Sequence, residues 1–317
     1  HHVFPLLADA VCTDSAFLAA PDSYDSMIRQ AKRLTIQQAQ RTAEFLLLYR
    51  FLLDQGLQPA VLKGIVCRSL YPHPEQRPSV DEDLLIDPKD FPQYHRALTG
   101  YGLALMDPEQ PPEGADEVSY VDRNRQLYIE LHMQPFPPDS AAYGDCNALF
   151  VGVLDRTVTV QIEDVTVRTL APTDHLLYLL CHAYKHFLHG GVGIRQVCDI
   201  GMLAAAYPDE IDWPHILEAC RRIRIDRFAA AIFRIAQRHL GFEMPAAFAG
   251  IDVDEAELLE DMLSGGLYGT VSADRVHSSN MTLDAVAANR SGRRRGGVLR
   301  SVFLPARSLS GRFPYLR

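Results

Sequence analysis

The sequence predicts an α+β fold, because short strands alternate with helices between two longer stretches of helical pattern. Apolar residues recur at helical spacing over residues 26–54 and again over residues 174–240. Between these stretches, compact apolar runs are separated by turn residues. We therefore expect four parts: an N-terminal helical segment (1–58), a central domain of strands and helices (59–171), a helical domain (172–264) and an Arg-rich extension (265–317).

The N-terminal segment is expected to be one long helix over residues 26–54. Its small and apolar positions follow helical spacing, and they are Ala31, Leu34, Ile36, Ala39, Ala43, Leu47 and Phe51. Gly56 follows as a C-terminal glycine would.

The central domain is predicted to begin with a strand at 60–63, a short helix at 64–70 and a second strand at 81–86. A helix over 88–98, ended by Gly100, comes next. Two hairpins should complete the domain, one pairing 118–121 with 126–133 around a turn at 122–125, the other pairing 158–162 with 165–170.

The helical domain is expected to start at an N-cap, Thr173, and to be interrupted at Gly190, Pro208 and Pro214. From Gly265 onward the chain is rich in Gly, Ser and Arg, and we expect it to be extended or partly disordered. The run Arg293-Arg-Arg295 predicts a loop or an anion contact there.

Charge and cysteine content exclude several classes of protein. The net charge is −9, and residues 285–317 contain eight arginines and no acid, which leaves −17 on residues 1–284. A body this acidic repels phosphate backbones, so general nucleic-acid binding is not expected. The six scattered cysteines form no C-x-x-C pair, which argues against a disulfide framework or a zinc knuckle. No apolar run is long enough to span a membrane and no secretory signal is recognised, so we expect a cytoplasmic protein.

Two acids on one strand are the most informative feature of the central domain. In Asp81-Glu82-Asp83, alternation places Asp81 and Asp83 on one face. Their repulsion needs a positive group between them, and a hard divalent cation suits carboxylate oxygens. The alternative is an exposed edge strand with solvated acids.

A second strand offers a third carboxylate. Leu127, Ile129, Leu131 and Met133 form an apolar face, while Tyr128, Glu130 and His132 share the other. Glu130 is then a third metal ligand, or else a solvent-facing acid on a half-exposed strand. If the three acids converge, their crowding should raise the pKa of at least one of them.

A lysine and a glycine precede these strands. In Leu62-Lys63-Gly64-Ile65 a predicted strand runs into a helix through glycine, which permits close approach of a phosphate to the backbone, and Lys63 adds a positive charge.

Histidines and a lysine follow one side of the helix that begins near Asp174. That side contains His175, Tyr178, His182, Lys185, His186 and His189. Such a positively charged stripe could face the phosphates of a nucleotide across a cleft, with His182 and Lys185 lining that cleft. The alternatives are a solvated face or, at the i, i+4 spacing of His182 and His186, a zinc pair.

Taken together, these motifs resemble the uncharacterised bacterial nucleotidyltransferase family, a branch of the polymerase-beta-like superfamily. The resemblance rests on Val61-Leu-Lys-Gly-Ile65, Leu70-Tyr-Pro72, Arg77-Pro-Ser79-x-Asp81-x-Asp83-Leu-Leu-Ile86, Ile129-Glu-Leu-His132, His182-Ala-Tyr-Lys-His186, Arg195-x-x-x-Asp199, Phe303-Leu-Pro305 and Phe313-Pro314. It departs from the superfamily in having Lys63-Gly64 for the usual Gly-Ser and Glu82 for an apolar residue. Glu82 suggests an exposed strand face or an additional acceptor contact.

The resemblance implies a mixed sheet flanked by helices, with residues 59–171 as the catalytic domain. It implies that Asp81, Asp83 and Glu130 bind Mg²⁺, with Mn²⁺ as an alternative, and that Lys63, Gly64, Arg77, Ser79, His182 and Lys185 bind an NTP. For Arg77 the alternative is a surface arginine paired with Glu75 or Asp81.

The implied reaction moves NMP from the NTP onto a hydroxyl or amine of an unknown small molecule, peptide or protein, and pyrophosphate leaves. The same site would also suit a phosphotransferase or phosphohydrolase. A non-catalytic nucleotide-binding partner in a biosynthetic or toxin–antitoxin complex is the other alternative.

Overall fold

The computed structural model describes residues 3–18, 21–109, 114–122, 127–189 and 191–265. Within these ranges the chain forms two compact units. The sheet unit contains residues up to 135 together with 152–171, and the helical unit contains 136–151 together with the residues from 172 onward. The predicted turn at 122–125 lies mostly outside the described residues, and the Arg-rich extension after Gly265 lies entirely outside them.

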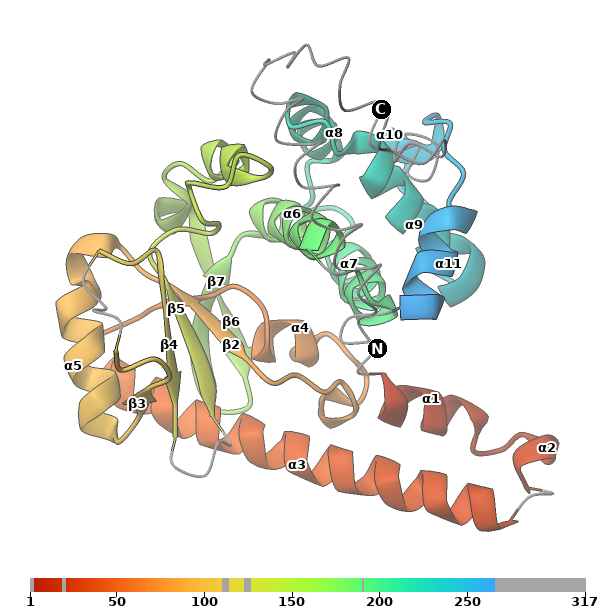
Figure 1. The fold of residues 1–317 in the computed structure, drawn as a ribbon, viewed down its shortest axis with the longest axis horizontal. Helices are drawn as coiled ribbons and strands as arrows, with labels where there is room; N and C mark the ends of the chain where they lie inside the picture. Colours follow the sequence, from red (N-terminus) through yellow and green to blue (C-terminus); the bar gives the residue numbers. More distant parts are fainter. Residues whose placement is uncertain (1–2, 19–20, 110–113, 123–126, 190, 266–317) are drawn as a thin grey trace, which may run out of the picture. The chain divides into compact units, whose positions relative to one another are not determined.

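The sheet unit is built on a mixed sheet that has seven strands within the described residues (Figure 1). In spatial order they are β3 (Ala104–Leu105), β4 (Glu117–Val121), β5 (Tyr128–His132), β2 (Glu82–Leu85), β1 (Ala60–Val61), β7 (Val165–Leu170) and β6 (Thr157–Ile162). The pairs β2–β5 and β1–β7 are parallel, and the other neighbours are antiparallel. The predicted α+β class with a mixed sheet is confirmed.

A 34-residue helix, α3 (Pro21–Asp54), contributes a large part of the apolar core of the sheet unit. Phe45, Leu48 and Leu52 of its C-terminal half are fully buried in the cluster that also holds Ile129 and Leu131 of β5. Tyr49 ties the helix to the sheet, because its hydroxyl donates to the Pro59 carbonyl and accepts from the Arg168 amide, each at 2.9 Å.

Shorter helices complete the sheet unit. They are α1 (Phe4–Val11), α2 (Ser15–Leu18), α4 (Ile65–Ser69), α5 (Phe91–Tyr101) and the 3₁₀ turns η1 (Pro74–Gln76), η2 (Pro88–Asp90) and η4 (Val153–Arg156). The predicted end of α5 at Gly100 is wrong. The helix passes through that glycine and stops at Gly102, whose φ of 110° is the left-handed conformation that terminates helices.

The helical unit contains η3 (Gly144–Leu149), α6 (Pro172–His189), α7 (Ile194–Ala206), α8 (Trp213–Arg222), α9 (Asp226–Leu240), α10 (Ala246–Ala249) and α11 (Ala256–Gly265). Thr173 is not an N-cap, since α6 already includes Pro172. Pro214 does not interrupt a helix either, because it lies in the first turn of α8. Backbone amides of the first turn have no acceptor within the helix, so a proline there costs no hydrogen bond.

Two further findings concern the cysteines and the length of the helices. The six cysteines all lie within the described ranges, and none of them forms a disulfide there. No helix in the described part of the chain combines the length and apolar character needed to cross a membrane.

Candidate active site

Strands β2 and β5 bring two of the three predicted carboxylates together. Their parallel register sets Asp83 directly opposite Glu130, so both side chains project from the same face of the sheet. One oxygen of each carboxylate and one ring nitrogen of His132 lie within 4.8 Å of one another. The strands that hold Asp83 and Glu130 are therefore neighbours, as a shared site for these two carboxylates requires.

Lys63 lies between the two aspartates. Its Nζ is 2.6 Å from Oδ2 of Asp81 and 3.1 Å from Oδ2 of Asp83. The exposed fractions of the side chains are 12% for Lys63, 23% for Asp81 and 1% for Asp83. The positive group that the paired acids require is, in this structure, the lysine ammonium.

His132 extends the cluster, and the sequence analysis gave it no role. Its Nε2 lies 3.1 Å from Oδ1 of Asp83 and 3.6 Å from Oε2 of Glu130, while its Nδ1 lies 3.4 Å from Oε2 of Glu117. The two-residue spacing from Glu130 was the signal that could have identified it. Glu117 carried no such signal, because it approaches His132 only through the pairing of β4 with β5.

The cluster changes the protonation of its members. Burial opposes a charge on Asp83, but Lys63 and then His132 outweigh it, and its pKa lies below the usual range. Burial, aided by repulsion from Asp83, raises the pKa of Glu130 to about 7 although His132 opposes the change. Burial would lower the pKa of His132, but hydrogen bonds to Asp83 and Glu130 raise it to about 9. A carboxylate pKa is raised, as the sequence predicted, with burial rather than repulsion as the leading cause.

The donor atoms of this cluster fit a hard divalent cation. Oδ2 of Asp83 is buried and accepts no hydrogen bond, although the Lys63 ammonium lies beside it. Carboxylate oxygens such as those of Asp81, Asp83 and Glu130 are the ligands that Mg²⁺ takes. His132 has a raised pKa of about 9, which favours the protonated ring, and its Nε2 lies 3.1 Å from Oδ1 of Asp83, so we treat it as a hydrogen-bond partner of Asp83 rather than as a ligand.

The turn at Gly64 is occupied by a side chain of the protein itself. The Ile65 amide donates to Oε2 of Glu82 at 2.7 Å, and a Cβ on Gly64 would lie 1.9 Å from the same oxygen. Glycine is required here by the approach of Glu82, and the φ of 65° adds a second reason. The expectation of an exposed strand face at Glu82 is wrong, because Arg68 pairs with this carboxylate inside the protein.

Arg77 and Ser79, both predicted to bind the nucleotide, are buried near this pair. The Ser79 hydroxyl accepts a hydrogen bond from Arg68, and Arg77 lies close enough to influence the pKa of both Arg68 and Glu82. The alternative of a surface arginine at position 77 is therefore wrong. A nucleotide contact by Arg77 or Ser79 stays a prediction.

The helix α6, which carries His182 and Lys185, belongs to the helical unit. Its predicted polar side is not a solvated face, because His175 and His182 are buried and Lys185 is half-buried. The Nε2 atoms of His182 and His186 are 3.2 Å apart. No third histidine, cysteine or carboxylate among the described residues completes a metal-binding group with them, so the zinc alternative has no support there. Nucleotide binding by His182 and Lys185 stays a prediction.

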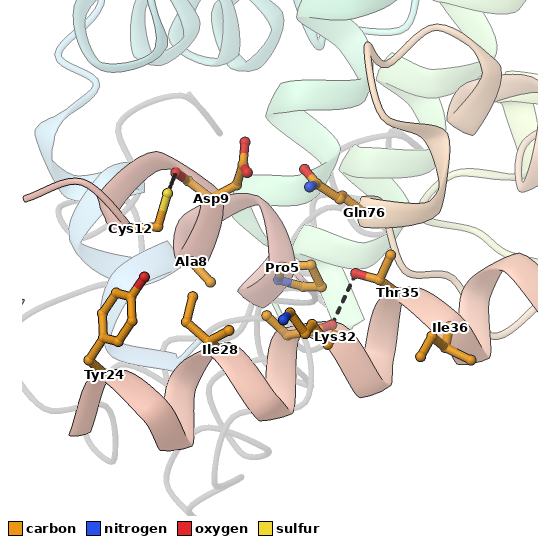
Figure 2. Close-up of a pocket in the computed structure, with 11 residues that line it drawn as sticks. Pro5, Ala8, Asp9, Cys12, Tyr24, Ile28, Lys32, Thr35, Ile36 and Gln76 are labelled. Atoms are coloured by element: carbon orange, nitrogen blue, oxygen red, sulfur yellow. Dashed lines mark hydrogen bonds between the residues drawn. The ribbon is translucent and has the colours of Figure 1, made fainter. Parts of the chain in front are cut away.

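A pocket between α1 and α3, also in the sheet unit, contains none of these residues (Figure 2). Its wall combines apolar side chains such as Pro5 and Ile28 with a few polar ones. The Cys12 thiol donates to the Asp9 carbonyl and the Thr35 hydroxyl to the Ala31 carbonyl, each at 3.0 Å. The Cys12 thiol and the Thr35 hydroxyl are thus satisfied by nearby backbone carbonyls. The candidate site remains the acidic cluster, which consists of Asp81, Asp83 and Glu130 with Lys63 and His132.

Comparison with known proteins identifies the family of the chain. No curated protein and no solved structure matches the chain. A family model described as an uncharacterised nucleotidyltransferase matches residues 1–241, which include every residue of the acidic cluster. The chain therefore belongs to this nucleotidyltransferase family.

Proposed function

We propose that the protein is a Mg²⁺-dependent nucleotidyltransferase, which moves NMP from an NTP onto a hydroxyl or amine acceptor. The observation that carries the proposal is the convergence of Asp83, Glu130 and His132 within 4.8 Å, beside Asp81 and Lys63. Membership of a nucleotidyltransferase family supports the same reaction class.

In this proposal Asp81, Asp83 and Glu130 hold the divalent ion, with Mn²⁺ as an alternative to Mg²⁺. When bound, the ion neutralises triphosphate charge and polarises the reacting phosphate. Lys63, which contacts both Asp81 and Asp83, would lie beside such an ion and could donate to the phosphates of the nucleotide.

Glu130 is the proposed proton acceptor. Burial raises its pKa to about 7 in the metal-free protein, which means that its surroundings favour the protonated carboxyl and so make the carboxylate more basic. The acceptor oxygen or nitrogen forms a bond to the α-phosphorus and gives its proton to Glu130. The bond between the α-phosphorus and the oxygen that bridges to the β-phosphate breaks, and pyrophosphate leaves with that oxygen.

The other residues predicted to contact the nucleotide receive different roles here. The Gly64 turn is filled by Glu82, so we assign Gly64 to the shape of the turn rather than to phosphate binding. We assign buried Arg77 and Ser79 to support of the same segment, and keep His182 and Lys185 as candidate nucleotide contacts. The acceptor is left open, because these residues describe only the nucleotide half of the site. We also propose a cytoplasmic location.

Position-specific labels test the reaction class. The protein is incubated with Mg²⁺ and each NTP, labelled in parallel at the α- or γ-phosphate, together with pooled hydroxyl and amine acceptors. Nucleotidyl transfer releases pyrophosphate and leaves the α-label on the acceptor. Transfer of the γ-label indicates a phosphotransferase, and free γ-phosphate indicates a phosphohydrolase. Tight NTP binding without turnover, equal in the wild type and in Asp83→Asn, indicates a non-catalytic binding protein.

A further inference from the structure

A charged pair lies inside the sheet unit. One of its members, Glu82, is next to Asp83 in β2, so its side chain points to the other face of the strand. Glu82 and Arg68 form an ion pair, and their side chains are only 8% and 1% exposed. Burial raises the pKa of Glu82, and the Arg68 guanidinium opposes that change. A buried ion pair of this kind is often no more stabilising than two apolar side chains of similar size. Stability alone is therefore a weak reason for charges at this position.

The Glu82 carboxylate joins two segments of the chain that meet at the candidate site. One oxygen accepts from the Ile65 amide at 2.7 Å, and the other accepts from Arg68. Ile65 follows Lys63 by two residues, with Gly64 between them closely packed on the same carboxylate. Glu82 itself lies between Asp81 and Asp83. The contact therefore connects the turn that carries the lysine with the strand that carries the acids.

A second set of bonds fixes the segment in front of Asp81. Arg68 also donates to the Ser79 hydroxyl. The Ser79 amide donates to Oε1 of Gln38 at 2.8 Å, and Arg41 donates to the Ser79 carbonyl at 3.0 Å. Both Gln38 and Arg41 belong to α3. The long helix, the turn at Gly64 and the strand β2 are thus connected through Arg68.

We propose that Glu82 is a positioning residue, which holds Lys63 at the distance from Asp81 and Asp83 that nucleotide binding requires. The essential contact is the acceptor that Glu82 offers to the Ile65 amide, and Arg68 compensates the charge of the carboxylate that provides it. The inference rests on the proposed function, because it assigns Lys63 to the phosphates of an NTP.

Two double variants isolate that contact. Arg68→Met with Glu82→Gln removes both charges but keeps a carbonyl oxygen for the Ile65 amide. Arg68→Met with Glu82→Met removes the charges and the acceptor. The first should bind a non-hydrolysable Mg²⁺–ATP analogue within about threefold of the wild type, and the second about tenfold more weakly, since small displacements of a binding group are costly.

Thermal unfolding and Mn²⁺ affinity separate positioning from a loss of folding. We expect both double variants to retain cooperative unfolding and a Kd for Mn²⁺ without nucleotide within about threefold of the wild type, because Asp83 and Glu130 remain paired by β2 and β5. Arg238→Met with Glu255→Met, which removes an ion pair of the helical unit, serves as the control and should leave nucleotide affinity unchanged. Equal nucleotide affinity in both Arg68 double variants, whether retained or lost, would overturn the inference.

A readout without nucleotide distinguishes this inference from the proposed function. The NMR signal of the Lys63 side chain, recorded at a fixed pH, reports its contact with the aspartates. We expect the signal to shift in the Met–Met variant and to stay near its wild-type position in the Met–Gln variant. If the wild type binds no nucleotide while this pattern holds, the proposed function fails and the positioning role stands. If the signal is unmoved in the Met–Met variant, the positioning role fails.

Discussion

Replacement of Lys63 by methionine tests whether the ammonium compensates the charge of the acidic cluster. Methionine keeps much of the length of the side chain and removes its charge. Because Nζ lies 2.6 Å from Asp81 and 3.1 Å from Asp83, the substitution leaves two neighbouring carboxylates without their shared cation. One of them, Asp83, is almost completely buried.

The size of the effect follows from the distances and the burial. At 3.1 Å, with an effective dielectric constant of about 20, one ion pair has a Coulomb energy of about 5 kcal/mol. Loss of one partner of a buried pair costs about 3–5 kcal/mol, and Asp81 is exposed enough to be partly rehydrated. We therefore expect a loss of about 3 kcal/mol in the free energy of unfolding at pH 7. For a unit of this length, that corresponds to a decrease in Tm of roughly 6–12 °C.

The assay is thermal unfolding in a chelator, with Lys89→Met as the matched control. Lys89 pairs with Asp87 at 2.8 Å, but the two side chains are 75% and 40% exposed. An exposed pair of similar length contributes little, so Lys89→Met should leave Tm unchanged. Excess Mg²⁺ should raise the Tm of the Lys63→Met protein more than that of the wild type, because the ion replaces the missing charge. Equal losses at positions 63 and 89 would refute the reasoning.

The remaining predictions concern pH and the helical unit. Because the folded pKa values of Glu130 and His132 are raised, to about 7 and about 9, these two groups bind more protons in the folded protein than in the unfolded chain. Their contribution to the metal-free stability should therefore fall as pH rises from about 5 to 9. Chemical denaturation at several pH values measures this trend, and stability that rises over the interval would contradict it. Lys185→Gln should weaken binding of the Mg²⁺–ATP analogue with only a small change in Tm, since Lys185 is half-buried and glutamine keeps much of its aliphatic side chain. Equal affinity, measured by calorimetry, would remove Lys185 from the nucleotide contacts.

Strand periodicity was sufficient to predict the centre of the site. The alternation of Asp81 and Asp83, and the sharing of one face by Glu130 and His132, follow from a period of two. The family resemblance supplied the pairing of these strands, which periodicity cannot give, because partners in a sheet are chosen by tertiary packing. The long helix α3 was also predictable, since apolar residues follow helical spacing over much of its length.

The role of Glu82 was not predictable from local pattern. An acid between two acids on a strand is typical of solvent exposure, yet Arg68, fourteen positions earlier, lies inside the protein and pairs with it. The contacts of Asp83 also change the expectation for Asp83→Asn. Repulsion between two acids predicts that this substitution leaves the metal-free fold as stable or slightly stabilised. With Lys63 and His132 bonded to Asp83, it should instead destabilise the fold.

The predicted polar stripe on α6 shows a related limit of sequence reasoning. Helical spacing correctly grouped His175, His182 and Lys185, but spacing alone does not say what covers a face. His175 and His182 are buried, so the alternative of a solvated face does not hold for them.

The most direct test of the central claim is Mn²⁺ binding measured by the EPR signal of the free ion, with and without a non-hydrolysable ATP analogue. If Asp83 and Glu130 form one site for a metal–nucleotide complex, the wild type should bind Mn²⁺ more tightly when the analogue is present. Both Asp83→Asn and Glu130→Gln should abolish this increase while the proteins still unfold cooperatively. Unchanged Mn²⁺–nucleotide binding by folded Asp83→Asn would contradict the assignment of the site.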